Sequence, residues 1–249
     1  MTRRGSATRP NPDAMTLTEH LGELRKRLIV SLIAFVLGAI VVYIFYPHLL
    51  HLLEEPYCQA TRHKNCGLYV TTPLQGFGIR LNVTGYGGIV IASPVLIYQI
   101  WRFVTPGLKA NEKKYAVPFA LATVTLFGFG AFIAWITLPH ALGFLGAVAG
   151  QGVTRIYSVQ SYLSLVLALM AIFGLTFQFP VVLIGLEIAG VLTPAKLSKF
   201  RRPAIVIIVI VAAVVTPSSD PFSMLALAVP MLVFYELSIL IGRFINARR

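Results

Sequence analysis

Long apolar runs without charge constrain this chain more than any other feature. The stretch "LIVSLIAFVLGAIVVYIFYP", residues 28–47, is the first of several. A helix needs about 20 residues to cross a hydrocarbon layer about 30 Å thick, and in lipid only a helix satisfies its own backbone in such a run. With 57% hydrophobic and 12% charged residues, the chain lies outside the range of ordinary soluble domains. The sequence therefore predicts an all-α polytopic membrane protein.

Charge, Pro and Gly signals divide the apolar sequence into six predicted transmembrane helices. They cover residues 28–47, 77–100, 115–138, 162–191, 203–215 and 222–245. Pro180 interrupts the fourth span and Pro230 lies inside the sixth. The fifth span is so short that its length alone fits a re-entrant segment as well as a crossing. We expect a transmembrane domain over 28–245, between a cytoplasmic segment, 1–27, and a cytoplasmic tail, 246–249.

The distribution of Lys and Arg predicts the orientation. If the N-terminus is cytoplasmic, the inside segments are 1–27, 101–114, 192–202 and 243–249, and they hold seventeen of the 21 basic residues. The positive-inside rule then places both termini in the cytoplasm. A re-entrant fifth segment would put the basic tail outside, so we keep six crossings and expect a thinned bilayer or shielding around the fifth. The net charge of +12 follows from topology, so we expect no nucleic-acid partner.

Two cysteines, Cys58 and Cys66, lie in the first predicted outside loop. In an oxidising compartment they would close a disulfide, and free thiols are the alternative. Three histidines nearby raise a metal site as a third interpretation, but the spacing matches no strong ligand signature. We therefore expect neither a metal nor a cofactor. The histidines are His48, His51 and His63.

The chain contains no HExxH, GxSxG or P-loop motif, so we expect no enzymatic activity. Polar residues at membrane depth are costly and are functional candidates by default. Glu187 and Glu236 are expected to pair with basic residues near the inside surface, and Asp220 is expected to cap the last helix. A competing hypothesis is a small secondary transporter that uses Gln178, Glu187 and Glu236 as a relay, although no inverted repeat is evident.

Acidic residues among bases at the inside face suggest a binding site. Glu19 and Glu23 are spaced i, i+4 and share a helix face, with Arg25 and Arg27 expected off it; Glu112 lies among lysines in the next inside loop. One interpretation is a solvated helix tip with weak local ion pairs. The other is a receptor for a peptide with consecutive arginines, because a carboxylate accepts a guanidinium in a bidentate geometry that lysine cannot reproduce.

Four blocks of sequence together carry a resemblance to a known family. They are "EHLGELRKRL", "SPVLIYQIWRFVTPGLKANEKK", "FGLTFQFPVVL" and "TPSSDPFSMLALAVPMLVFYE". In this order and spacing the chain resembles TatC, the multispanning receptor subunit of the twin-arginine protein translocase, over roughly residues 16–245. The resemblance implies six helices in a concave bundle in the bacterial cytoplasmic (inner) membrane. Both termini would be cytoplasmic, and the fifth and sixth spans short.

The resemblance also implies a function. The family binds twin-arginine signal peptides of folded export substrates, works with single-span TatA-type and TatB-type subunits and draws on the protonmotive force. We expect several copies of the chain in the complex, and contact with membrane lipids. Glu23 and Glu112 match the glutamates that contact the arginine pair. Neighbouring candidates for signal recognition are Arg25, Phe103, Leu108 and Glu19, and candidates for structural or partner-contact roles are Pro56, Pro106, Gln178, Asp220 and Glu236.

Two positions depart from the family pattern. Gln178 stands where many relatives carry a glutamate, and an amide forms hydrogen bonds but carries neither charge nor proton. A proton-dependent role at this position is therefore not expected. In "TTPLQGF", Leu74 and Gln75 replace aromatic residues of some relatives.

Overall fold

The computed structural model describes residues 17–61, 67–104, 116–150, 157–188, 190–218 and 220–247. Within these ranges the chain is almost entirely helical, which confirms the predicted all-α class. The helices are α1 (Leu17–Ile44), α2 (Tyr46–Ala60), α3 (Gln75–Val104), α4 (Ala116–Val148), α5 (Val159–Thr176), α6 (Phe179–Ile188), α7 (Pro194–Lys199), α8 (Arg201–Val215) and α9 (Pro221–Ala247).

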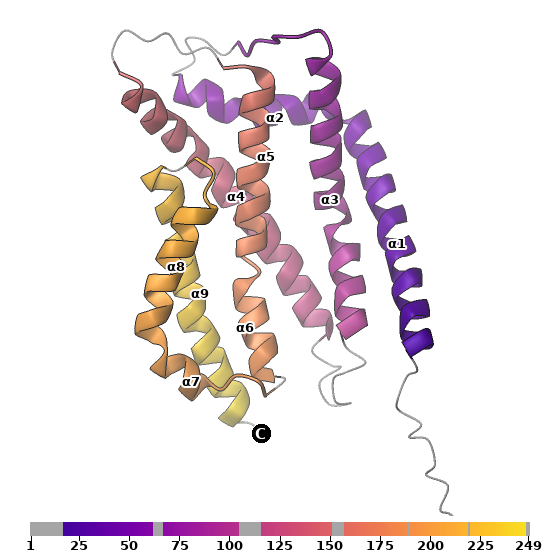
Figure 1. The fold of residues 1–249 in the computed structure, drawn as a ribbon, viewed down its shortest axis with the longest axis vertical. Helices are drawn as coiled ribbons and strands as arrows, with labels where there is room; N and C mark the ends of the chain where they lie inside the picture. Colours follow the sequence, from indigo (N-terminus) through magenta and orange to yellow (C-terminus); the bar gives the residue numbers. More distant parts are fainter. Residues whose placement is uncertain are drawn as a thin grey trace, which may run out of the picture.

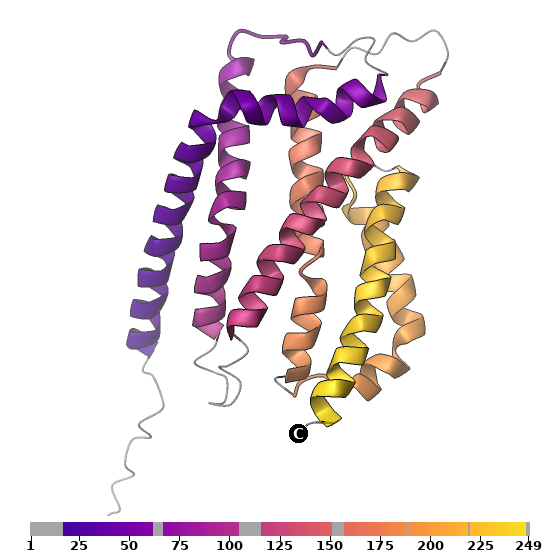
Figure 2. The same ribbon diagram turned by 180° about the vertical axis from the view of Figure 1, so that it is seen from behind.

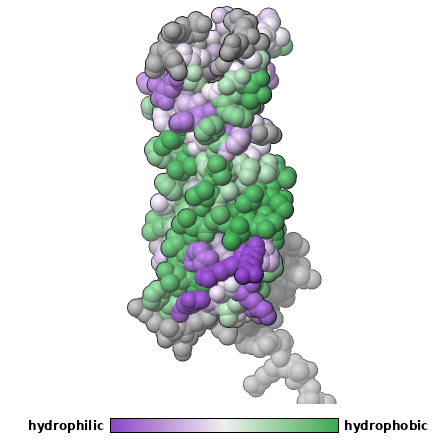
Figure 3. Space-filling view, turned by 90° about the vertical axis from the view of Figure 1, so that its left-hand side faces the viewer, coloured by the Kyte–Doolittle hydropathy of each residue, from purple (hydrophilic) through white to green (hydrophobic). Residues whose placement is uncertain are grey.

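Most of the long helices run between two ends of a flattened bundle, and α2 lies across the upper end (Figures 1 and 2). The body is broad in Figure 1 and narrow in Figure 3. The start of α1, the end of α3, the start of α4 and the end of α9 all lie at the lower end (Figure 1). Together with α7 and the start of α8, these helix ends carry most of the basic residues that the structure describes, and we call this end of the molecule the basic end.

Five segments of the described chain are long and apolar enough to cross a membrane. They are Gly22–Ile44, Gln75–Ile100, Ala120–Val148, Val159–Ile188 and Pro221–Phe244. The fifth predicted span corresponds to α8, whose 15 residues reach only about 22 Å at about 1.5 Å per residue. The expectation of a short sixth span is wrong, because α9 has 27 residues.

The fourth predicted span is interrupted, as expected, close to Pro180. Helix α5 ends at Thr176, the chain turns through Phe177 and Gln178, and α6 begins at Phe179. Pro180 thus lies in the first turn of α6, where a missing N–H removes no helical hydrogen bond. The break places Gln178 about two thirds of the way along the combined span, Val159–Ile188.

Helix α2 lies where the sequence predicts an outside loop, because this stretch combines histidines, two glutamates and a proline and has no membrane signal. Pro56 is fully buried inside this helix. A proline cannot donate to the carbonyl one turn earlier, and the indole Nε1 of Trp135 in α4 donates to that carbonyl, of Leu52, at 3.1 Å. The hydroxyl of Tyr162 in α5 donates to the carbonyl of Leu53 at 2.7 Å. Carbonyls around Pro56 therefore attach α2 to two long helices.

Glycines allow the long helices to approach closely. A Cβ on Gly38 of α1 would lie 2.8 Å from the carbonyl oxygen of Gly88 in α3, and one on Gly130 of α4 would lie 2.6 Å from that of Phe173 in α5. Small residues at such crossings let backbones pack directly, which stabilises helix pairs in lipid. The α1–α3 contact fixes the two helices that form the candidate site.

Candidate functional site

Glu23 lies near the start of α1, and its side chain pairs with a base of the same helix. The guanidinium Nη2 of Arg27 donates to Glu23 Oε1, one turn further along. The expectation that Arg27 lies off the Glu23 face is wrong, because the two residues are themselves spaced i, i+4. Arg25 is exposed on another face of the helix. The i, i+4 spacing was visible in the sequence and is the signal that could have found this pair.

Arg27 also joins α1 to α3. Its Nη1 donates to the backbone carbonyl of Gln99 at 3.1 Å, and the residue is only 8% exposed. A buried guanidinium needs several acceptors, and these two contacts supply one within α1 and one on α3. Arg27 therefore fixes the position of the Glu23 carboxylate relative to α3.

The second oxygen of Glu23 has no such contact. Glu23 Oε2 is buried and accepts no hydrogen bond from any residue that the structure describes. It borders a pocket of about 380 Å³ lined by Gly22, Glu23, Lys26, Arg27, Val30 and Gln99. Leaving a buried charged acceptor unsatisfied costs about 1–3 kcal/mol or more, so this oxygen favours a donor that enters the pocket.

The other predicted signal-binding residues are placed only in part. Glu19 lies in α1 and Phe103 in α3, the latter one turn beyond Gln99, but their side chains are not described. Glu112, Leu108 and Pro106 lie outside the described residues. The structure thus brings Glu23, Arg27 and Gln99 together and leaves the contribution of the α3–α4 loop as a prediction.

Gln178 joins the α5–α6 break to α4. Its Nε2 donates to the carbonyl of Thr123 at 3.1 Å and to that of Gly174 at 3.2 Å. Its Oε1 is buried and has no hydrogen-bond partner within the described ranges. The Nε2 of Gln178 therefore joins two helices, and its Oε1 can still accept a hydrogen bond.

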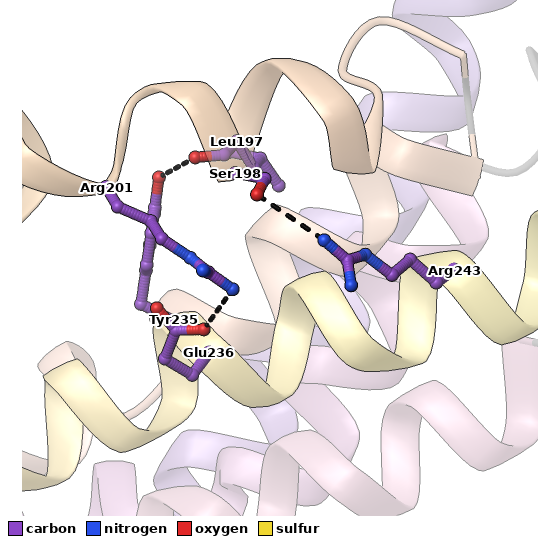
Figure 4. A network of polar contacts seen from close by, with 6 residues as sticks. All are labelled: Leu197, Ser198, Arg201, Tyr235, Glu236 and Arg243. Atoms are coloured by element: carbon purple, nitrogen blue, oxygen red, sulfur yellow. Dashed lines mark hydrogen bonds and ion pairs between the residues drawn. The ribbon is translucent and has the colours of Figure 1, made fainter.

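Asp220 and Glu236 make the local contacts that the sequence predicted. Asp220 caps α9, accepting the Ser223 N–H at 2.8 Å and the Ser218 hydroxyl. Glu236 of α9 accepts Nη2 of Arg201 at the start of α8, at 2.8 Å (Figure 4). Both roles are structural, and the predicted ion pair of Glu236 is confirmed.

Glu187 does not form the predicted ion pair with any described residue. Both of its carboxylate oxygens are buried without a hydrogen-bond partner in that part of the chain, and a Cβ on Gly242 of α9 would overlap them. Gln178, Glu187 and Glu236 therefore have separate surroundings, and nothing in the described geometry connects them as a transporter relay.

At the other end of the molecule, the residues around α2 and the start of α3 have structural contacts. Cys58 is disulfide-bonded, but Cys66 lies outside the described residues, so the Cys58–Cys66 pairing stays a prediction. Gln75 Oε1 accepts the backbone N–H of Thr71 at 2.6 Å and its hydroxyl at 2.8 Å, whereas Leu74 is exposed. Gln75 therefore closes the turn before α3.

One carboxyl on α2 is electrostatically distinct. Partial burial raises the pKa of Glu54 above its usual value, and nearby His51 opposes the shift.

No group of three or more His, Cys, Asp or Glu residues that could hold a metal occurs among the residues with a described position.

Comparison with known proteins gives one family. A sequence profile of the Sec-independent protein translocase protein (TatC) matches residues 19–230. The TatC protein of Frankia casuarinae is 41% identical over 245 residues, covering 94% of this chain and 67% of its own length. That of Aquifex aeolicus is 38% identical over 241 residues, covering 94% of this chain and 98% of its own.

Solved structures agree with the sequence comparison. A crystal structure of the twin-arginine translocase receptor TatC in DDM superposes with a TM-score of 0.75 at 38% identity, covering 90% of this chain and 99% of that one. A second crystal structure of this receptor gives a TM-score of 0.72 at 37% identity. The chain therefore belongs to the TatC family and is a multi-pass membrane component of the bacterial Sec-independent protein translocase, not an enzyme.

Proposed function

We propose that this chain is the signal-peptide receptor of a twin-arginine translocase, and that Glu23 and Glu112 bind the arginine pair. The observation that carries the proposal is the second oxygen of Glu23, which is buried beside a pocket and unsatisfied among the described residues. In a native protein a buried acceptor without a partner calls for an explanation. A guanidinium from a bound peptide supplies the missing donor.

The chemistry favours arginine over other cations. Arg27 holds Glu23 Oε1, so an incoming guanidinium approaches Oε2 at a fixed position. Lys26 and Arg27 line the same pocket and repel a simple cation, so only a donor that forms well-directed hydrogen bonds binds there. A second carboxylate, Glu112, would receive the other arginine. Arg25, Phe103 and Leu108 would then contact the residues around the pair.

The membrane arrangement in this proposal has both termini in the cytoplasm. The start of α1 and the end of α9 lie at the basic end (Figure 1), and the positive-inside rule assigns that end to the cytoplasmic face of the inner membrane. Helix α8 then serves as a sixth, short crossing paired with α9. Residues 1–27 form the cytoplasmic recognition segment, and residues 246–249 form the tail.

Gln178 is the proposed contact for a single-span partner of the TatA or TatB type. Its Oε1, which has no partner among the described residues, lies within a membrane span, where an interhelical hydrogen bond contributes on the order of 1 kcal/mol. The contact is a neutral hydrogen bond, because the amide has no charge. Such an assembly would nucleate the export complex that the protonmotive force drives.

Peptide binding tests the proposal. Purified protein in detergent is titrated with a fluorescent signal peptide carrying Arg-Arg and with its Lys-Lys counterpart. We expect a clear preference for Arg-Arg that disappears in Glu23→Gln and in Glu112→Gln. Glu55→Gln is the matched control, because Glu55 is exposed on α2 at the other end of the molecule (Figure 1). Equal binding of the two peptides by the unmodified protein would remove the receptor assignment.

A further inference from the structure

A groove between the start of α8 and the last turns of α9 combines charge with apolar surface. The pocket measures about 560 Å³. It is lined by Arg201, Leu232, Val233, Glu236, Leu237, Ile239, Leu240 and Arg243. Val233, Leu237 and Leu240 are exposed, so the groove opens towards the surroundings of the protein. Figure 3 shows the side of the bundle that carries α8 and α9, where a strongly hydrophilic patch interrupts an apolar surface near the lower end.

Positive charge is in excess at this groove. The carboxylate of Glu236 is neutralised by Arg201, whereas Arg243 pairs with no carboxylate of the described residues and makes a long contact, 3.4 Å, with the hydroxyl of Ser198 (Figure 4). Lys199 is exposed and lines a neighbouring pocket together with Arg243. The Nε of Arg201 is buried without a hydrogen-bond partner in the described chain. The groove is therefore complementary to an anion.

The depth of the groove points to a lipid. From Pro221, Glu236 lies about 22 Å along α9 and Arg243 about 33 Å, at about 1.5 Å per residue. Helix α8 gives the same depth, because Arg201 lies about 21 Å from Val215 on that scale. The start of α8 and the end of α9 lie at the basic end of the molecule (Figure 1), so the groove lies where a hydrocarbon layer about 30 Å thick meets the lipid headgroups. The headgroups of that leaflet are then within reach of its charges.

We propose that this groove binds the headgroup of an anionic phospholipid from the leaflet at the basic end. The phosphate lies between Arg201 and Arg243, and Glu236 holds Arg201 in place from the other side. One acyl chain runs along Val233, Leu237 and Leu240. A free phosphate ion would use the charges but leave this apolar wall uncovered. This site is on the opposite side of the bundle from Glu23, so it is independent of the peptide pocket.

Lipid retention measured by native mass spectrometry tests the site. Delipidated full-length protein in DDM is mixed with phosphatidylglycerol or with phosphatidylcholine. We expect phosphatidylglycerol to bind about fivefold more tightly, the contribution of one basic residue beside an anionic headgroup. Arg243→Gln should remove this preference. Val233→Trp, which fills the groove without changing charge, should reduce binding of both lipids.

The matched control is Arg202→Gln, which removes the same charge from α8 at a position outside the groove lining. It should bind phosphatidylglycerol as the unmodified protein does. Equal binding of the two lipids, or an equal effect of Arg202→Gln and Arg243→Gln, would overturn the site. Competition by millimolar inorganic phosphate would overturn the assignment to a lipid. Intact lipid binding in Arg243→Gln together with loss of co-purified single-span subunits would assign the groove to a partner helix instead.

Discussion

Two Glu–Arg pairs at the basic end have the same chemistry and different surroundings. Glu23 and Arg27 lie one turn apart in α1, with Arg27 buried and tied to α3. Glu236 and Arg201 join α9 to α8, and their side chains are 53% and 44% exposed. Water or lipid headgroups can solvate the free oxygen of Glu236, whereas Glu23 Oε2 is buried without a described partner. The buried, incompletely satisfied pair is therefore the one that we propose as the binding site, and the exposed pair holds two helices together.

The largest expected difference between the two pairs is in the rate at which the translocase exports its substrates. In a strain that lacks its own receptor, Glu23→Gln should reduce transport of a twin-arginine reporter about 30-fold, because removing one partner of a buried charged hydrogen bond costs about 2 kcal/mol or more. Glu236→Gln should change transport less than about twofold, as expected for an exposed pair. Transport rates per receptor molecule are compared after immunoblotting. Equal losses in the two variants would contradict the distinction between the pairs.

Replacing Arg27 should lower the free energy of unfolding more than replacing Arg201. Arg27→Gln should lower the free energy of unfolding by about 1.5–3 kcal/mol, since it leaves Glu23 without its charged partner and removes the contact with Gln99. Arg201→Gln should lower it by at most about 1 kcal/mol. Reversible unfolding in mixed micelles with increasing SDS measures both. A larger loss of stability in Arg201→Gln than in Arg27→Gln would contradict the distinction between the two pairs.

The buried carboxylate of Glu187 tests whether burial by itself is enough for a glutamate to bind the signal peptide. Gly242→Ala should destabilise the protein by about 1–3 kcal/mol through overpacking, because the new Cβ would overlap the Glu187 carboxylate. Adding Glu187→Ala should recover most of that loss, and peptide binding should stay unchanged throughout. Gly143→Ala is the control, since a Cβ there meets nothing within 4 Å. Weaker peptide binding in Glu187→Ala would show that the site extends beyond Glu23.

Raising the salt concentration should produce the smallest difference between the two Glu–Arg pairs. At 1 M salt the screening length falls to about 3 Å, which weakens exposed pairs much more than buried ones. Double-mutant cycles on unfolding should therefore show that the Arg201–Glu236 coupling disappears between low and high salt. The Arg27–Glu23 coupling should keep more than half of its value. Equal loss of both couplings would mean that the Glu23 site is as solvated as the Glu236 pair.

The sequence predicted the helical class and six membrane spans, and five of these correspond to helices of the described chain that are long and apolar enough to cross a membrane. It did not predict α2, whose mixed composition has no membrane signal, or the extension of α4 to Val148 past its predicted end at Leu138. Pro139 supported that early end, but it lies inside α4, since neighbouring helices and side chains can compensate for a proline in a membrane helix. The sequence therefore predicted the existence of the membrane spans better than the residues at which they end.

For the candidate site, the sequence supplied the residue types but not their partners. It predicted a binding role for Glu23, which stays a prediction, and for Glu236 it predicted a basic partner near the inside surface, which the structure confirms. It placed Arg27 off the Glu23 face, although the i, i+4 spacing was available. The contact of Arg27 with the Gln99 carbonyl could not be predicted, because it depends on the crossing of α1 and α3 and on a backbone atom.

The central claim is that Glu23 Oε2 accepts a guanidinium of the signal peptide. The most direct measurement is a double-mutant cycle between Glu23→Gln and a peptide in which citrulline, the neutral isostere, replaces each signal arginine in turn. For one of the two arginines we predict a coupling energy of about 1.5 kcal/mol or more, with the Glu55→Gln cycle near zero. Coupling near zero between Glu23 and both arginines would contradict the account, because the carboxylate and the peptide would then bind independently.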